Sequence, residues 1–266
     1  MLGPMLATLV TQAITMTGLV VGLGLIGLLL HALERRVSRR VAQKLGWRAV
    51  LITGWLGVPL HELSHLAIAR LLGQRIVDYR LFAPNPATGT LGYVRHAYLR
   101  PSVWQPIKEA CIAIAPLIAG LAALTALLAW TCAPGTLTNL YAAMRDSALR
   151  PTHDLLANNA ALAQTLGNGV ALITGAAWRA RSVWLPLQLY LVVAVTAHMA
   201  PSTRDLRAAG VGLIGILVAA GLAVTLIGAP TGVALLMLTT SLFVTASLLT
   251  LAFQVAYGAA AGLIAA

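Results

Sequence analysis

The stretch GWLGVPLHELSHLAIARLL, residues 54–72, is apolar along most of its length but carries two histidines and a glutamate in its middle. Its length and composition predict a helix that crosses a membrane, with residues 49–71 as the expected span. Ionisable side chains are costly at the depth of the hydrocarbon core, so their presence there indicates a functional site. The polar residues of this segment are therefore the first candidates for function.

The composition of the whole chain is that of a membrane protein. Of its 266 residues, 59% are hydrophobic and only 9% are charged, whereas about 25% of the residues of a soluble domain are charged. We therefore expect one all-α polytopic membrane domain over residues 1–266, in an integral, multi-pass protein of a prokaryotic cell membrane. Six apolar stretches are long enough to cross a bilayer. The expected transmembrane helices lie near residues 5–31, 49–71, 110–131, 183–200, 209–228 and 232–262.

Three connections between these spans carry signals of their own. Residues 31–48 hold six basic side chains and predict a surface helix whose charges reach lipid headgroups. In residues 72–109, two β-prone segments flank the turn-forming sequence APNPATG, which predicts a small β-hairpin. Residues 132–182 predict two helices at the membrane interface. Because the net charge of +11 is spread over all the connections, we expect the lipid bilayer as a partner and no nucleic acid.

Residues 61–65, HELSH, form the pattern H-E-x-x-H. On a helix, His61 and His65 lie on one face, one turn apart, so both imidazoles can bind one zinc ion while Glu62 acts as general base toward the attacking water. A catalytic zinc ion usually has three protein ligands and one open position. The pattern therefore predicts one zinc ion per chain, held in part by these two histidines. The alternative is that the three polar side chains bond one another or neighbouring helices.

The third ligand is expected in VTAHMAPSTRDLRAAGVG, residues 195–212, where the chain leaves one expected span, reaches Pro201 and starts the next span after Asp205. Backbone that is unwound at such a depth must be buried in protein or line a cavity. His198 and Asp205 are the candidates in this stretch. We favour Asp205, because a carboxylate offsets part of the zinc charge and a residue that follows a proline break can fold back toward the metal.

Together these motifs resemble the site-2 protease family of intramembrane zinc metalloproteases. That family combines H-E-x-x-H on one span with N-x-x-P and a following Asp-Gly on a later span, and its aspartate is the third zinc ligand. The resemblance implies this role for Asp205. In this chain His198 stands at the position of the asparagine, and Asp205 follows Pro201 by four residues instead of five. Leu206 follows Asp205, where the family has glycine. His198 is therefore an alternative ligand, or a contact for the substrate carbonyl or the developing oxyanion.

Asp205 also has alternative roles that do not involve zinc. It could cap the N-terminus of a helix, or pair with Arg204 or Arg207. The remaining histidines fall in the connections between spans, and we interpret them as solvated or interfacial side chains. They are His31, His96 and His153.

The expected function is intramembrane proteolysis by a zinc-dependent metalloendopeptidase that hydrolyses peptide bonds in or near the transmembrane segments of membrane proteins. Its substrate would be a membrane protein or peptide, unwound locally and paired with the edge of the hairpin predicted near residues 75–100. Two other functions are open. One is a transporter or scaffold in which a metal or a polar triad is structural, and the other is a zinc hydrolase of a non-peptide substrate.

Overall fold

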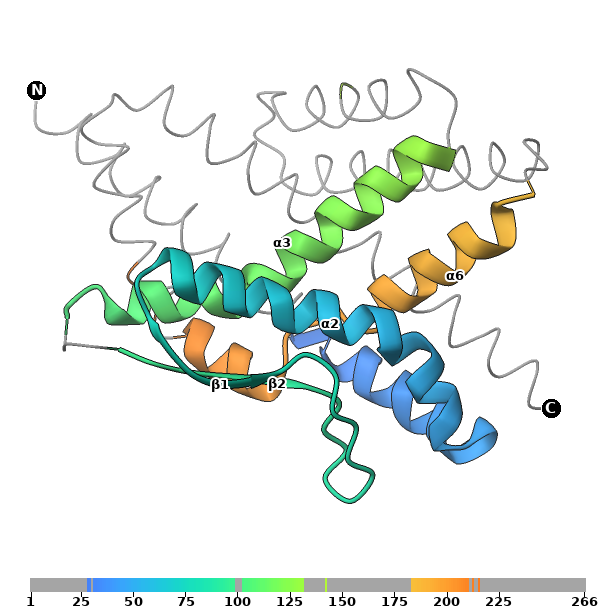
Figure 1. The fold of residues 1–266 in the computed structure, drawn as a ribbon, viewed down its shortest axis with the longest axis horizontal. Coiled ribbons are helices and arrows are strands. Elements are labelled where there is room, and N and C mark those ends of the chain that lie inside the picture. The colour runs from blue at the N-terminus through green and yellow to red at the C-terminus, as the bar shows by residue number, and fades with distance from the viewer. Residues whose placement is uncertain are drawn as a thin grey trace, which may run out of the picture.

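The structure of the protein is a computed structural model that describes residues 31–98, 102–131 and 183–210, together with residues 28, 29, 142, 212 and 215. The labelled elements are shown in Figure 1. Residues 31–45 and 203–210 are also helical. In chain order the labelled elements are α2 (Trp47–Leu71), β1 (Arg75–Arg80), β2 (Tyr93–Ala97), α3 (Gln105–Thr131) and α6 (Leu185–Thr196).

Helix α2 is central to the described fold and contacts α3, α6 and both strands. It is a single helix that continues through Pro59, so the helix expected at residues 49–71 is observed and begins slightly earlier. Gly46 separates α2 from the helix over residues 31–45. Its φ of 80° lies in the left-handed region, which glycine adopts without the steric cost of a side chain.

An apolar core joins α2, α3 and α6, and two glycines let these helices approach closely. A Cβ on Gly57 of α2 would collide with the backbone oxygen of Ala194 in α6, and a Cβ on Gly120 of α3 would lie 2.6 Å from the Met199 Cβ. Gly57 is one helical turn before His61, so this contact brings the end of α6 beside the first HELSH histidine. The buried residues of this core are Leu117, Leu124, Val192, Val195, Met199 and Ala200.

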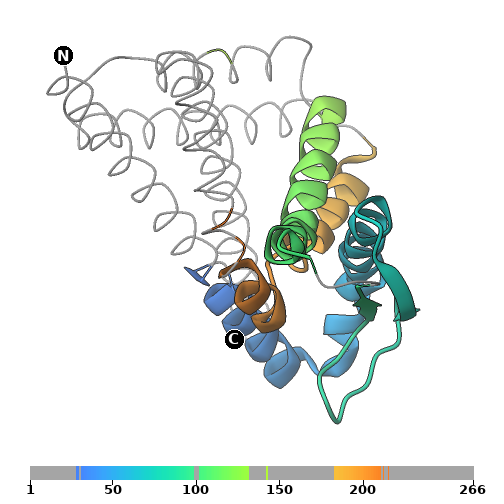
Figure 2. The ribbon, with the colours of Figure 1, turned by 90° about the vertical axis from the view of Figure 1, so that its left-hand side faces the viewer.

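Strands β1 and β2 form a two-stranded antiparallel sheet, as the sequence predicted. The pairing places Arg80 opposite Tyr93, and the connecting loop closes through a bridge between Asn85 and Thr90. Figure 2 shows the hairpin alongside α2, which both strands contact. Among the described residues the sheet has two strands, so each strand has one edge that no other described strand pairs with.

The expectation of a polytopic protein with six transmembrane helices is wrong. In the part of the chain that the structure describes, one helix is long and apolar enough to cross a membrane, the segment Gln105–Leu127 of α3. Helix α2 does not meet this criterion, because His61, Glu62 and His65 lower the hydropathy of its middle. Helix α6 is apolar but has 12 residues, whereas a span needs about 20.

The boundaries of the expected spans also differ from the structure. Helix α6 ends at Thr196, and Pro201 follows without the N–H group that a longer helix would need. The helix expected at residues 110–131 already begins at Gln105. Several other expected elements lie almost wholly outside the described residues, namely the spans at residues 5–31, 209–228 and 232–262 and the interfacial helices in residues 132–182.

Candidate metal centre

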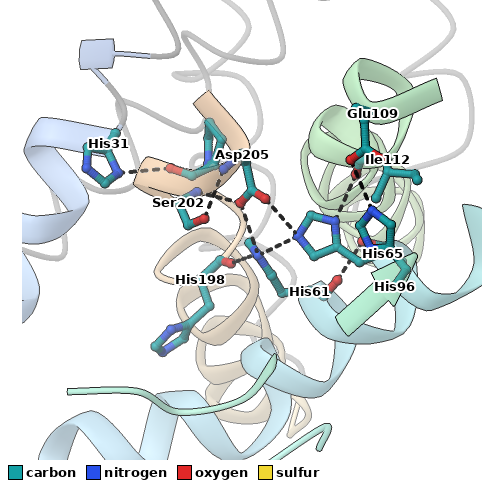
Figure 3. Close-up of polar contacts among 11 residues, drawn as sticks. His31, His61, His65, His96, Glu109, Ile112, His198, Ser202 and Asp205 are labelled. Atoms are coloured by element: carbon teal, nitrogen blue, oxygen red, sulfur yellow. Dashed lines mark hydrogen bonds and ion pairs between the residues drawn. The ribbon is translucent and has the colours of Figure 1, made fainter. Parts of the chain in front are cut away.

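The HELSH histidines face each other on α2, with His61 Nε2 and His65 Nε2 3.1 Å apart. Each ring is held through its other nitrogen. His61 Nδ1 is 2.7 Å from the backbone oxygen of His198, and His65 Nδ1 is 2.8 Å from that of Ile112. These oxygens come from the turn after α6 and from α3 (Figure 3). The packing of the helices therefore sets the orientation of both imidazoles.

The backbone bonds determine which nitrogen of each ring carries the proton. A carbonyl oxygen only accepts, so Nδ1 donates in both rings, and in a neutral ring Nε2 then has a lone pair and no proton. Two lone pairs 3.1 Å apart repel each other unless a proton or a metal ion lies near both. Metal-binding histidines are commonly oriented in this way, with the second ring nitrogen donating to a carbonyl or carboxylate.

Asp205 brings a carboxylate to the same place from the helix over residues 203–210. Its Oδ1 lies 3.4 Å from His65 Nε2, and its Oδ2 lies 3.8 Å from His61 Nε2. One ligand atom from each of the three residues lies within 4.8 Å of the others, so the group could hold a metal ion. The structure therefore brings together the two motif histidines and the favoured aspartate.

Ser202 and Asp205 exchange two hydrogen bonds, one of which orients the Asp205 carboxylate. The Ser202 N–H donates to Asp205 Oδ2 over 2.7 Å, and the Asp205 N–H donates to Ser202 Oγ over 3.2 Å. This reciprocal pair is of the capping-box type, in which residues three apart bond free N–H groups at the start of a helix. Asp205 thus takes part in a helix cap and also faces the histidines. Among the described residues, its ion pairs are with His61 and His65 and not with its arginine neighbours.

The ligand atoms are largely shielded from solvent. The side chains of His61, His65 and Asp205 are 12%, 10% and 14% exposed. Burial on its own raises the pKa of the Asp205 carboxyl, but a protonated His65 and the bond from Ser202 favour the carboxylate and hold this pKa below its ordinary value. Asp205 is therefore ionised near neutral pH, as a ligand for a cation must be.

Glu62 is buried and lies next to the group of ligand residues on α2. Its side chain packs against Gly92, the residue before β2. A Cβ on Gly92 would lie 2.9 Å from Glu62 Cγ and 2.8 Å from the backbone oxygen of Leu81. Real Cβ atoms do not come this close, so glycine at this position leaves the room that the Glu62 side chain occupies. The start of β2 therefore lies directly against the expected general base.

The His198 side chain points away from the three ligand residues (Figure 3). Its Nε2 is 3.1 Å from Thr53 Oγ1, and its ring packs against Gly57. The structure therefore does not group the His198 ring with the three residues that could hold a metal ion, although the sequence had left His198 open as an alternative ligand. His198 contributes to the site through its backbone oxygen, which accepts the hydrogen bond from His61.

Sequence reasoning missed the groups that orient the ligands. The backbone oxygens of Ile112 and His198 carry no signal in a sequence, because every residue has such an oxygen. Ser202 had a signal, since the spacing S-x-x-D before a helix is typical of a helix cap. His31 and His96 were interpreted as solvated or interfacial, but His31 bonds to the Asp205 turn and His96 bonds to a glutamate of α3. His153 lies outside the described residues.

Comparison of this chain with models of protein families, with curated proteins and with solved structures finds no match. The function of this chain is therefore inferred from the residues of the site. The site has two histidines whose Nδ1 atoms are hydrogen-bonded to backbone oxygens and an aspartate whose carboxylate accepts a bond from the Ser202 N–H. A buried glutamate lies beside them. A site of this composition can bind a divalent cation and transfer a proton.

Proposed function

We propose that the protein is a zinc-dependent metalloendopeptidase, a divergent member of the site-2 protease family, that hydrolyses peptide bonds in or near transmembrane segments. His61, His65 and Asp205 hold one zinc ion, and Glu62 is the general base. One observation carries the proposal. The imidazoles of His61 and His65, whose Nδ1 atoms are bonded to backbone oxygens, and the Asp205 carboxylate bring one ligand atom each to within 4.8 Å of one another, an arrangement that could hold a metal ion.

The spacing of the ligand atoms supports zinc. Tetrahedral coordination with zinc–nitrogen bonds of about 2.0–2.1 Å places ligand atoms roughly 3.3–3.4 Å apart. In this site the two Nε2 atoms are 3.1 Å apart, His65 Nε2 is 3.4 Å from Asp205 Oδ1, and His61 Nε2 is 3.8 Å from the other carboxylate oxygen, Oδ2. One ligand atom from each residue lies within 4.8 Å of the others, so a small contraction around the ion would complete this geometry. Two imidazoles and one carboxylate, with the fourth position open, also form the ligand set of known zinc peptidases.

The chain's own residues supply the proton transfers of peptide hydrolysis. Bound zinc would provide Lewis-acid activation of the attacking water and the scissile carbonyl. Glu62 would take a proton from the water as the water attacks the carbonyl carbon, and would then deliver that proton to the nitrogen of the leaving amine. Gly92 contributes by leaving the space beside the Glu62 side chain free of a Cβ.

Exposed apolar side chains near the site support a substrate from a membrane. Ile52, Trp55 and Leu63 of α2 are exposed, and α3 contains the segment that is long and apolar enough to cross a bilayer. An exposed apolar surface of this kind is typical of contact with lipid or with an apolar partner. A membrane-protein segment is therefore the class of substrate that this apolar surface of α2 favours.

The hairpin offers a way to present such a segment. Gly92 lies against Glu62 immediately before β2, and each strand has one edge that no other strand in the described part of the chain pairs with. An extended peptide that pairs with this edge would bring its backbone toward the general base. Replacing alternate residues of β2 with proline removes N–H donors and should abolish cleavage while the zinc content stays unchanged. Unchanged cleavage would exclude this route for the substrate.

Zinc content and peptide cleavage together test the proposed function. The wild-type chain, purified in detergent without chelators, should contain about one zinc ion and cleave a transmembrane peptide. Glu62→Gln should keep the zinc and cut the cleavage rate by about 10²–10⁴-fold, because the general base is lost. Elemental analysis measures the metal, and mass spectrometry of the products measures cleavage.

Three outcomes would contradict the proposed function. A wild-type chain without zinc would reduce the HELSH segment to polar contacts between helices. A zinc-loaded chain that cleaves equally fast with Glu62 or glutamine would exclude this mechanism, and a zinc-loaded chain without any cleavage would favour a structural metal.

A further inference from the structure

The turn before the third ligand is bonded to His31, a side chain far away in the sequence. His31 Nδ1 lies 2.9 Å from the Pro201 backbone oxygen, and His31 Nε2 lies 3.2 Å from Thr203 Oγ1. Figure 3 shows the His31 ring beside the Ser202 turn, on the side opposite His65. His31 is therefore not a ligand, but it contacts the residues on both sides of Ser202.

A single protonation state of the His31 ring satisfies both contacts. The Pro201 oxygen only accepts, so Nδ1–H donates to it, and Nε2 of the neutral ring accepts from the Thr203 hydroxyl. A phenyl ring or a methyl group in place of the imidazole could make neither bond. The contact therefore depends on histidine chemistry and not on volume alone.

The two contacts flank the residue that orients the third ligand. Pro201 precedes Ser202, and Thr203 follows it. Ser202 in turn exchanges two hydrogen bonds with Asp205. A displacement of this turn would therefore move the Asp205 carboxylate relative to the two Nε2 atoms.

The helix that carries His31 is packed against α2. Val37 and Val41 of that helix are buried together with Val50 of α2. Helix α2 also carries the two histidine ligands. His31 thus connects the turn of the third ligand to the unit that holds the other two.

We propose that His31 is a positioning residue of the metal site, which holds the turn from Pro201 to Thr203 so that the Asp205 carboxylate faces His65. The inference rests on the proposed function, because it takes Asp205 as a zinc ligand. Residues that orient ligands from outside the coordination shell typically contribute 10–100-fold to metal affinity. The loss of the His31 bonds should therefore weaken zinc binding by a factor of about this size.

Competition for zinc with a chromogenic chelator, on the full chain in detergent, tests this role. His31→Ala removes both bonds, and His31→Phe removes them but keeps a ring. Both variants should bind zinc about 10–100-fold more weakly than the wild type. Thr203→Val removes only the bond to Nε2 and should have a smaller effect. His96→Phe, the same exchange at a histidine outside the site, should keep the wild-type affinity.

A rescue variant and a spectroscopic probe separate positioning from a loss of stability. His31→Asn keeps an N–H donor close to the place of Nδ1 and should recover part of the affinity that His31→Phe loses. Bound cobalt(II) absorbs visible light in a way that reports its ligand geometry. The cobalt spectrum should change in His31→Phe and stay unchanged in His96→Phe, because only the former displaces the carboxylate of Asp205.

The outcomes distinguish a failure of this inference from a failure of the proposed function. If the His31 variants keep the affinity and the cobalt spectrum of the wild type while Asp205→Ala loses zinc, His31 is not a positioning residue and the proposed function stands. If Asp205→Ala binds zinc as tightly as the wild type, or the wild type binds none, both fail. Should His31→Ala not fold, His31→Phe and Thr203→Val give the same decision.

Discussion

Two contacts between a histidine and a carboxylate in this structure differ mainly in their surroundings. His96 Nε2 lies 3.0 Å from Glu109 Oε2, which is closer than the 3.4 Å between His65 Nε2 and Asp205 Oδ1. Yet His96 meets its carboxylate alone, and the other Glu109 oxygen accepts a hydrogen bond from Gln105. The contact of His65 shares its space with a second imidazole.

A short distance between a histidine nitrogen and a carboxylate oxygen does not by itself identify a metal site. At His96 and Glu109, a donor meets an acceptor and no further charge is required. At the HELSH site, the proton of each neutral imidazole lies on Nδ1, bonded to a backbone oxygen, so that three acceptors face one another. The acceptors repel one another until a cation or a proton joins them, and this need distinguishes the site from the pair.

The largest difference in zinc affinity is expected between the variants that remove His65 from the HELSH site and His96 from the His96–Glu109 pair. His65→Ala should lower zinc affinity by more than about 100-fold, because a coordinating side chain contributes more than the 10–100-fold of an outer partner. His96→Ala should leave the affinity unchanged. Chelator competition measures both variants, and equal losses would contradict the distinction between the two contacts.

Removing the carboxylate of each contact should change zinc affinity almost as differently. Asp205→Ala should weaken zinc binding by roughly 100-fold, whereas Glu109→Ala should not weaken it. Ser202→Ala is the matched control for the helix cap, because it removes the Oγ acceptor and leaves the carboxylate. It should lower the free energy of unfolding by about 1 kcal/mol and weaken zinc binding less than Asp205→Ala does, because the Ser202 N–H that donates to Asp205 Oδ2 belongs to the backbone and stays. A similar loss of zinc in Ser202→Ala and Asp205→Ala would indicate that Asp205 acts through the cap and not as a ligand.

A substitution beside Glu62 should separate zinc binding from catalysis within the HELSH site. Gly92→Ala would place a Cβ 2.9 Å from Glu62 Cγ and displace this side chain. Misplacement of a catalytic group by about 1 Å can cost up to 10²-fold, so cleavage should fall by about 10–100-fold with unchanged zinc content. Gly54→Ala is the control on α2, since its Cβ would meet only ordinary contacts at 3.5 Å. Equal activity of the two variants would show that Glu62 tolerates the displacement.

The smallest effect is expected at the His96 pair itself. Glu109→Gln keeps the shape of the side chain and removes its charge. Because the two side chains are 20% and 28% exposed, water competes for the contact, and the free energy of unfolding should change by less than about 1 kcal/mol. Chemical denaturation in detergent measures the change. A larger loss would mean that this pair supports the hairpin more strongly than its exposure indicates.

Local patterns in the sequence predicted a large part of the site. His61 and His65 share a face because residues four apart do so on any helix, whatever surrounds it. The hairpin also followed from local signals, since β-prone segments flank the turn around Asn85. Composition was a poorer guide to architecture. It predicted six membrane spans, but α2 carries polar side chains in its middle and α6 is short.

The tertiary structure decided which residues complete the site. Asp205 and His198 lie in the same short stretch, and no local rule states which side chain turns toward α2. The close approach at Gly57 brings the His198 backbone oxygen to His61, the capping bonds of Ser202 turn Asp205 toward His65, and an oxygen of α3 orients the second imidazole. The Ser202 bonds are local, but the contacts of the two carbonyl oxygens join residues far apart in the chain. Those contacts depend on how the helices pack and not on the sequence around each residue.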